Sequence, residues 1–89
     1  MVVALSDIDR VNRYNMTNIV WTKPACPFCD MAKTLLKQKG IEFEERNIGL
    51  GWTREQLLEA VPGARSVPQI FLDDQYIGTY QHLKEHLES

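Results

Sequence analysis

The sequence lacks three features, each of which would have indicated a class of protein. No apolar stretch approaches the roughly 20 residues that a membrane-spanning helix requires. Positive charge is not in excess, because 10 lysine and arginine residues face 12 acidic ones and the net charge is −2. Binding to nucleic acid through broad neutralisation of phosphates is therefore not expected. The N-terminus has no basic segment followed by an apolar core, so no secretory signal is predicted.

Cysteine is also scarce. The chain has two cysteines, Cys26 and Cys29, which are too few for the disulfide-dense scaffold of a small secreted domain. A bridge between positions three apart closes only a very short loop and constrains the unfolded chain little. The two thiols are therefore expected to matter for their chemistry.

The remaining composition is that of an ordinary globular chain. Hydrophobic residues make up 44% and charged residues 25% of the 89 positions, which is too apolar for intrinsic disorder. Residues 1–15 are predicted to be an N-terminal leader or extension, either a short helix or disordered, because polar residues interrupt any longer apolar pattern. Residues 16–89 are predicted to form a single domain.

Alternating and helical apolar patterns predict seven elements in the order β-α-β-α-β-β-α. A helix begins at Pro27, where the missing N–H is tolerated, and Gly40 closes it. Another begins with the capping-box pair Thr53 and Gln56. Strands are predicted at 17–22, 41–48, 69–72 and 75–77, and helices at 27–39, 53–61 and 79–87. This order predicts an α/β fold in which a four-stranded mixed sheet, with a parallel crossover and an antiparallel hairpin, is flanked by three helices.

The segment Cys26-Pro27-Phe28-Cys29 lies where a strand passes into a helix. A thiol at a helix N-terminus faces unpaired backbone N–H groups and the positive end of the helix dipole, which favour its thiolate. Lys23, three residues earlier, adds a positive charge. We therefore predict that Cys26 is an exposed nucleophile and that Cys29, one turn further on, is less exposed and attacks mixed disulfides formed on Cys26.

A Cys-x-x-Cys pair alone leaves other interpretations open. The two thiols could be incidental, or half of a zinc site completed by His82 and His86. The gap between the cysteine and histidine pairs is far longer than the roughly 12–15 residues typical of a zinc finger. No metal is therefore expected, and two histidines four apart on a helix have solvent exposure as their ordinary explanation.

Four segments, taken together and in order, resemble a glutaredoxin of the dithiol class, which has the thioredoxin fold. They are Thr22-Lys23-Pro24-Ala25-Cys26-Pro27-Phe28-Cys29, Ser66-Val67-Pro68-Gln69-Ile70-Phe71, Asp73-Asp74-Gln75 and Ile77-Gly78. The resemblance extends over about residues 17–87. It implies a glutathione-disulfide oxidoreductase in which Cys26 attacks disulfides and glutathione mixed disulfides, and Cys29 resolves protein mixed disulfides.

The resemblance also implies how glutathione is bound. The Val67–Pro68 bond is expected to be cis, with the Val67 backbone pairing with the cysteinyl part of glutathione. Lys23 is expected to attract a glutathione carboxylate, and Phe28 to border the groove. The helix start after Gly78 is expected to hold the γ-glutamyl carboxylate.

The sequence departs from the family pattern in this last region. The usual Gly-Gly pair is Gly78-Thr79, and Gln81 and His82 stand where polar or acidic residues usually meet the γ-glutamyl ammonium. A threonine hydroxyl can cap the helix and compete for the N–H groups that bind the ligand. A missing carboxylate removes a charge-assisted hydrogen bond. We therefore predict weaker glutathione binding than in the family at large.

The resemblance implies glutathione as the reductant, and protein disulfides and glutathionylated proteins, ribonucleotide reductase among them, as clients. The expected setting is the cytoplasm, where thiols are kept reduced, and the expected state is a monomer with no nucleic-acid or membrane partner. One alternative is a glutaredoxin-like redoxin reduced by a flavin-dependent thioredoxin reductase. Another, from a different class, is a module that binds a metal or an iron–sulfur cluster between two chains. Pro27 argues against this module, because the residue at that position is usually small where a cluster is held.

Overall fold

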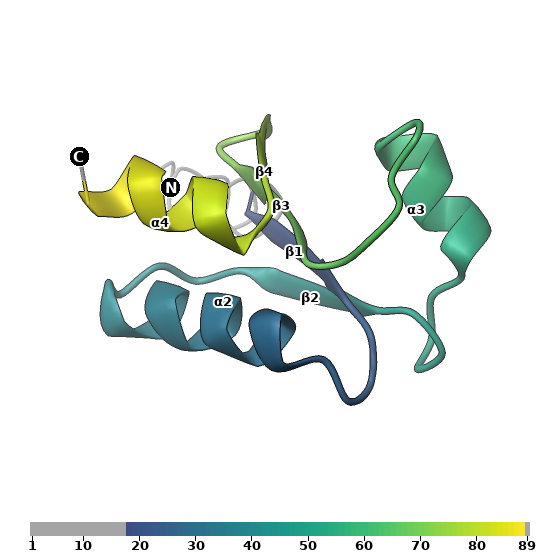
Figure 1. The fold of residues 1–89 in the computed structure, drawn as a ribbon, viewed down its shortest axis with the longest axis horizontal. Coiled ribbons are helices and arrows are strands. Elements are labelled where there is room, and N and C mark those ends of the chain that lie inside the picture. Colours follow the sequence, from purple (N-terminus) through teal and green to yellow (C-terminus); the bar gives the residue numbers. More distant parts are fainter. Residues whose placement is uncertain (1–17, 89) are drawn as a thin grey trace, which may run out of the picture.

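The computed structural model describes residues 18–88, so the leader predicted for residues 1–15 lies outside the described residues. The elements follow the predicted order (Figure 1). The strands are β1 (Ile19–Thr22), β2 (Glu44–Asn47), β3 (Gln69–Leu72) and β4 (Gln75–Gly78), and the helices are α2 (Pro27–Gln38), α3 (Arg54–Ala60) and α4 (Tyr80–Glu88). No helix within residues 18–88 is both long enough and apolar enough to cross a membrane.

The four strands form one mixed sheet in the order β2-β1-β3-β4. Strand β1 is parallel to β2 and antiparallel to β3, and β3 pairs antiparallel with β4. The predicted four-stranded mixed sheet with three helices is therefore confirmed. At the centre of the sheet β1 is buried, whereas β2 at one edge carries the polar sequence Glu-Glu-Arg-Asn. Charged side chains on an edge strand discourage pairing with other chains.

The side chains of β1 alternate between the two faces of the sheet, and each face has its own apolar cluster. Val20 points toward helices α2 and α4, where it packs with Leu36 and Leu83. Trp21 points toward α3 on the opposite face, where it packs with Leu57. Figure 1 shows this layering, with α2 and α4 together on one side and α3 apart from them. Because β1 and β3 pair with each other, the sheet fixes the segment that follows β1 relative to the segment that precedes β3.

Local signals in the sequence fix most element boundaries. Gly40 ends the first helix region with a φ of +72°, the left-handed conformation that glycine adopts without strain. The Thr53 hydroxyl accepts a hydrogen bond from the Gln56 backbone at 3.1 Å, and the Gln56 side chain accepts one from the Thr53 N–H at 2.9 Å. The capping box is therefore confirmed. Asp73 and Asp74, with φ of +53° and +64°, form the tight hairpin turn between β3 and β4.

The second strand is shorter than predicted. It covers Glu44–Asn47 rather than 41–48, because Ile41 and Phe43 leave the sheet and pack against the α2–α4 cluster instead. Arg46 of this strand stacks on the opposite face, with its guanidinium 4.4 Å from the Trp52 ring centroid and 5.3 Å from that of Trp21. Such cation–π contacts anchor the edge strand to the α3 side of the sheet.

Candidate active site at the start of helix α2

Cys26 is the N-cap residue of helix α2. Its backbone is extended, with φ −122° and ψ 99°, and its sulfur accepts a hydrogen bond from the Cys29 backbone N–H at 3.2 Å. Ala25, directly before it, has a φ of +56°, which is a strained conformation for a residue with a Cβ. The tight turn between β1 and α2 therefore aims the sulfur at the amide groups of the first helical turn, where a negative charge is stabilised.

The two cysteines are joined as a disulfide, with their Cα atoms 5.2 Å apart. Cys26 is 7% exposed and Cys29 is 1% exposed. The prediction that Cys26 is the more accessible of the pair is confirmed, but the prediction that its side chain is exposed is wrong. The sulfur is covered because it is bonded to Cys29 and faces the Val67 carbonyl oxygen at 3.8 Å.

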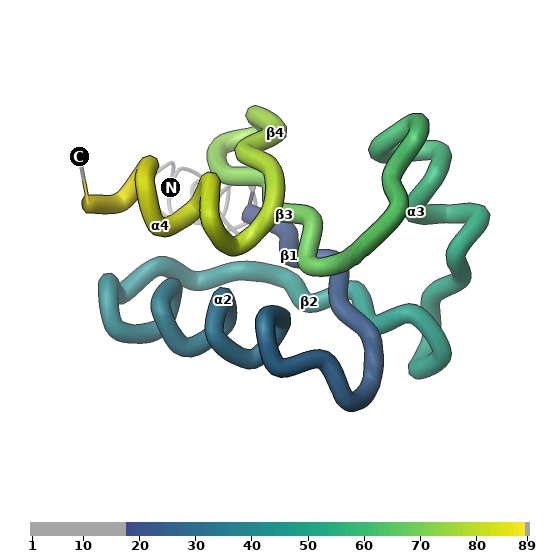
Figure 2. The backbone as a smooth tube through the Cα atoms, in the orientation of Figure 1, coloured from purple at the N-terminus to yellow at the C-terminus, as the bar shows by residue number. Residues whose placement is uncertain are grey.

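The loop before β3 forms the opposite wall of the site. Its Val67–Pro68 bond is cis, as the resemblance implied, and Pro68 is buried. Gln69 holds the loop in place, since its side-chain amide donates to the Ser66 carbonyl at 2.8 Å and its amide oxygen accepts from the Tyr76 hydroxyl. Figure 2 shows this loop passing in front of the end of β1, from which the turn into α2 continues. Residues 41 positions apart thus meet at the Cys26 sulfur.

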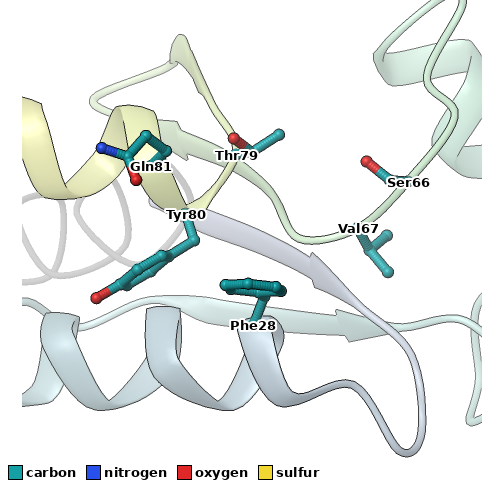
Figure 3. Close-up of a pocket in the computed structure, with 6 residues that line it drawn as sticks. All are labelled: Phe28, Ser66, Val67, Thr79, Tyr80 and Gln81. Atoms are coloured by element: carbon teal, nitrogen blue, oxygen red, sulfur yellow. The ribbon is translucent and has the colours of Figure 1, made fainter.

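A pocket of about 370 Å³ opens beside this loop (Figure 3). Its walls come from the start of α2, the loop before β3 and the start of α4. The lining residues are Phe28, Ser66, Val67, Thr79, Tyr80 and Gln81. The Phe28 ring, 59% exposed, lies 6.1 Å from the Tyr80 ring between centroids, so the two aromatics form one apolar wall. The pocket thus brings together three residues predicted from sequence, namely Phe28, Val67 and Thr79.

Two further wall residues were not predicted as site residues. The sequence pattern predicted only that Tyr80 is an apolar position of the last helix. The packing of α4 beside α2 places its ring against Phe28. Ser66 directly precedes Val67 and Pro68, and that adjacency is the signal that could have identified it. Gln81, which the sequence placed opposite the γ-glutamyl ammonium, also lines the pocket.

Thr79 does not act as predicted. Its hydroxyl contacts the His82 Nδ1 atom at 3.1 Å, and the structure shows no hydrogen bond from it to a backbone N–H within residues 18–88. The Thr79 backbone N–H donates to the same Nδ1 atom, also at 3.1 Å. His82 therefore folds back over Gly78, where a Cβ would lie only 2.5 Å from Nδ1. The imidazole, rather than the threonine hydroxyl, occupies an amide at the start of α4.

Lys23 lies on the other side of the loop. It borders a smaller groove of about 130 Å³ that also includes Arg54, Arg65 and Val67, so Val67 separates two hollows. Pro68 and Gly78 adjoin the larger pocket without lining it. Cys26, Cys29, His82 and His86 are not assembled into a metal-binding group, and residues 18–88 hold no cluster of three or more potential ligands.

Sequence and structure comparisons agree on the family. The family model described as Glutaredoxin matches residues 18–77. A probable glutaredoxin of Synechocystis sp. is 50% identical over 60 residues, which cover 66% of this chain and 68% of that protein. Glutaredoxin 3 of Escherichia coli is 45% identical over 65 residues, covering 71% and 77% respectively. The crystal structure of glutaredoxin 1 from Francisella tularensis, complexed with cacodylate, matches with a TM-score of 0.68 and 29% identity, over 80% of this chain and 91% of that one.

The geometry of the site agrees with these likenesses. A pair of cysteines begins a helix, the first sulfur accepts a backbone hydrogen bond, and a cis-proline loop lies against it. This chain belongs to the glutaredoxin family, and it is a thiol–disulfide oxidoreductase with a thioredoxin-like fold.

Proposed function

We propose that this glutaredoxin is glutathione-dependent and that it reduces protein disulfides and removes glutathione from glutathionylated proteins. The observation that carries the proposal is the position of the Cys26 sulfur, which caps α2 and accepts the Cys29 N–H at 3.2 Å beside the Val67 carbonyl. A hydrogen bond to sulfur and the helix dipole both favour the thiolate and lower the pKa of a cysteine in such a position. A thiolate of this kind is also a good leaving group in later exchange steps.

The proposed reaction consists of two disulfide exchanges. The Cys26 thiolate attacks one sulfur of a client disulfide, the client S–S bond breaks, and the departing client thiolate takes up a proton. The Cys29 thiol, giving up its proton, then attacks the Cys26 sulfur and releases the second client thiolate. The client gains two electrons, and the protein is left with the Cys26–Cys29 disulfide seen in the structure. Two glutathione molecules would restore the dithiol and leave as glutathione disulfide.

The larger pocket suits glutathione in size and chemistry. Its volume of about 370 Å³ lies within the range of about 300–1,000 Å³ typical of small-molecule sites. We propose that Val67 pairs with the cysteinyl backbone next to cis-Pro68 and that Phe28 covers the ligand. Lys23, which lies beyond Val67 in the smaller groove, would attract a carboxylate of the same ligand. The start of α4 after Gly78 would hold the γ-glutamyl carboxylate. This binding would be weakened because the Thr79 backbone N–H already donates to His82 Nδ1.

The proposed clients are protein disulfides and glutathionylated proteins, with ribonucleotide reductase as one candidate. Such a donor needs a supply of reduced glutathione, so we place it in the cytoplasm. We propose that it works as a monomer, since its catalytic pair and its pocket come from a single chain.

One assay tests the proposal directly. A glutathionylated peptide is reduced under steady-state conditions with either glutathione plus glutathione reductase or thioredoxin reductase as the electron source. We expect turnover only with glutathione. Turnover only with thioredoxin reductase would overturn the proposal.

The same assay tests a second candidate, a redoxin reduced by a flavin-dependent thioredoxin reductase. One observation favours this candidate. Thr79 stands where the family pattern has a second glycine, and its backbone N–H donates to His82 Nδ1 rather than being available to glutathione. An absorbance spectrum of the freshly purified protein tests the cluster-binding alternative, because an iron–sulfur cluster absorbs visible light.

A further inference from the structure

Two side chains of the β3–β4 hairpin hold the loop that carries Val67. Gln69, the first residue of β3, is 4% exposed, and its side-chain amide nitrogen donates to the Ser66 carbonyl oxygen at 2.8 Å. Its amide oxygen accepts a hydrogen bond from the hydroxyl of Tyr76 on β4. Ser66 and Val67 follow one another along the wall of the larger pocket (Figure 3). We call Gln69 and Tyr76 the loop bridge, because they connect the hairpin to this wall.

The hydroxyl of Tyr76 fixes which end of the Gln69 amide faces the loop. The Ser66 carbonyl can only accept a hydrogen bond, so the NH₂ end of the amide must face it. The oxygen end then needs a donor, since a buried polar atom without a partner is costly, and Tyr76 is that donor. The Tyr76 ring stacks on Phe71, its cross-strand partner, with the centroids 5.4 Å apart. The hydroxyl is therefore held in place although Tyr76 is 51% exposed.

The loop bridge sets the direction of the Val67 N–H. The Ser66–Val67 peptide bond is trans, so this N–H points opposite to the Ser66 carbonyl that Gln69 holds. A residue before proline is confined to extended conformations, in which its N–H and C=O point to the same side. The Val67 carbonyl faces the Cys26 sulfur at 3.8 Å. The Val67 N–H therefore turns to the side of the reacting sulfur, and it has no hydrogen-bond partner within residues 18–88.

From these contacts we infer that Gln69 and Tyr76 are positioning residues that orient the Val67 backbone for pairing with the backbone of the substrate's reacting cysteine. The inference rests on the proposed pairing of Val67 with substrate. Gln69 acts through the Ser66–Val67 peptide, and Tyr76 acts through Gln69. A donor that is already oriented needs no ordering when the substrate binds, which strengthens the contact. Without the loop bridge the peptide plane can rotate and turn the N–H away from the substrate.

The test compares two small uncharged disulfides in a single turnover. One is the disulfide of N-acetylcysteine N-methylamide, which has backbone amides on both sides of each reacting cysteine. The other is bis(2-hydroxyethyl) disulfide, which has no amide. Protein reduced with dithiothreitol and desalted is mixed with either one, and acid quenching followed by chromatography gives the rate. Each rate is divided by the rate of the same disulfide with free dithiothreitol, so that the intrinsic reactivities of the two disulfides cancel.

The reaction is the same for both disulfides. The Cys26 thiolate attacks one sulfur, the small S–S bond breaks and one thiol leaves with a proton. Cys29 then gives up its proton, attacks the Cys26 sulfur and releases the second thiol. The small disulfide gains two electrons, and the protein ends as the Cys26–Cys29 disulfide. Neither substrate is glutathione, so the result does not depend on whether glutathione is the reductant.

We expect the wild type to prefer the amide-bearing disulfide about tenfold after this correction, an effect of one or two backbone hydrogen bonds. Gln69→Met, which keeps the side-chain length and removes the amide, should slow this disulfide about 3- to 10-fold and leave the other unchanged. Tyr76→Phe, which keeps the ring at a half-exposed position and so keeps the fold, should slow it about twofold. Added to Gln69→Met, it should have no further effect, because Tyr76 acts only through Gln69.

The matched control is Gln75→Met, the same substitution at an exposed position of the same hairpin whose side chain makes no hydrogen bond within residues 18–88. It should keep both wild-type rates. The pH profile of Cys26 alkylation by iodoacetamide should match the wild type in every variant, because the N–H that bonds the sulfur belongs to Cys29 of α2.

Several outcomes would overturn the inference. One is a corrected wild-type preference near one. Another is a Tyr76→Phe variant that keeps the full wild-type preference, and this result can be read even if Gln69→Met does not fold. A loop-bridge variant that slows both disulfides equally, or a control that loses as much as Gln69→Met, would show a general structural defect. Additive effects in the double variant would show that Tyr76 does not act through Gln69.

Discussion

We predict that replacing Thr79 and His82, whose side chains contact each other, strengthens the proposed binding of glutathione. His82 Nδ1 lies 3.1 Å from both the backbone nitrogen and the hydroxyl of Thr79. The double variant Thr79→Gly with His82→Asp removes the imidazole and the hydroxyl, and it introduces a carboxylate that can face the γ-glutamyl ammonium. At an exposed position such a pair contributes about 0.2–1 kcal/mol, which is roughly 1.4- to 5-fold in affinity.

The assay is steady-state reduction of a glutathionylated peptide at varied glutathione concentration. We expect KM for glutathione to fall about 1.4- to 5-fold while kcat changes little, because Cys26 and the α2 helix start are untouched. Glycine at a helix N-cap costs only a few tenths of a kcal/mol relative to threonine, so the fold is retained. His82→Asn is the uncharged control and should improve KM less. An unchanged or higher KM in the double variant, with kcat retained, would refute the reasoning.

Three further predictions concern the thiols and the sheet edge. Cys26→Ser is expected to abolish all activity, whereas Cys29→Ser should retain deglutathionylation and lose reduction of protein disulfides; equal loss of both activities would contradict the assigned roles. In the reduced protein, the rate of Cys26 alkylation by iodoacetamide against pH should report a pKa below the roughly 8.5 of a free cysteine, and an unshifted value would remove the helix-start argument. Burial raises the pKa of Glu45, but hydrogen bonds from Lys33 and Thr22 outweigh it and hold that pKa below its ordinary value of 4.5. The stability that ionised Glu45 contributes is therefore present above pH 4.5 and is lost as the pH falls through the lowered pKa. In denaturant titrations, Glu45→Gln should lower the free energy of unfolding by about 1 kcal/mol at pH 7 and by less at pH 3.

The position of Val67 connects the proposed activities of the protein. Its carbonyl faces the Cys26 sulfur, and one hollow lies on each side of it. The larger hollow is bordered by Phe28 and Tyr80, and the smaller one by arginines.

The amino-acid sequence by itself determined the features that depend on short stretches of chain. The capping box of Thr53, the left-handed Gly40 and the turn at Asp73 and Asp74 each follow from the conformations those residues prefer. The placement of Cys26 at a strand-to-helix boundary follows in the same way, because Pro27 marks the first helical position. Element order also predicted the parallel crossover from β1 through α2 to β2, but not that β3, which also follows a helix, runs antiparallel to β1.

Only the tertiary structure decided which distant residues meet. Local conformational preference does not predict that Tyr80 packs against Phe28, or that Arg54 and Arg65 lie beside Val67. These contacts depend on how the helices pack on the two faces of the sheet. The same holds for burial, and the sulfur of Cys26 is covered by a loop some 40 residues away.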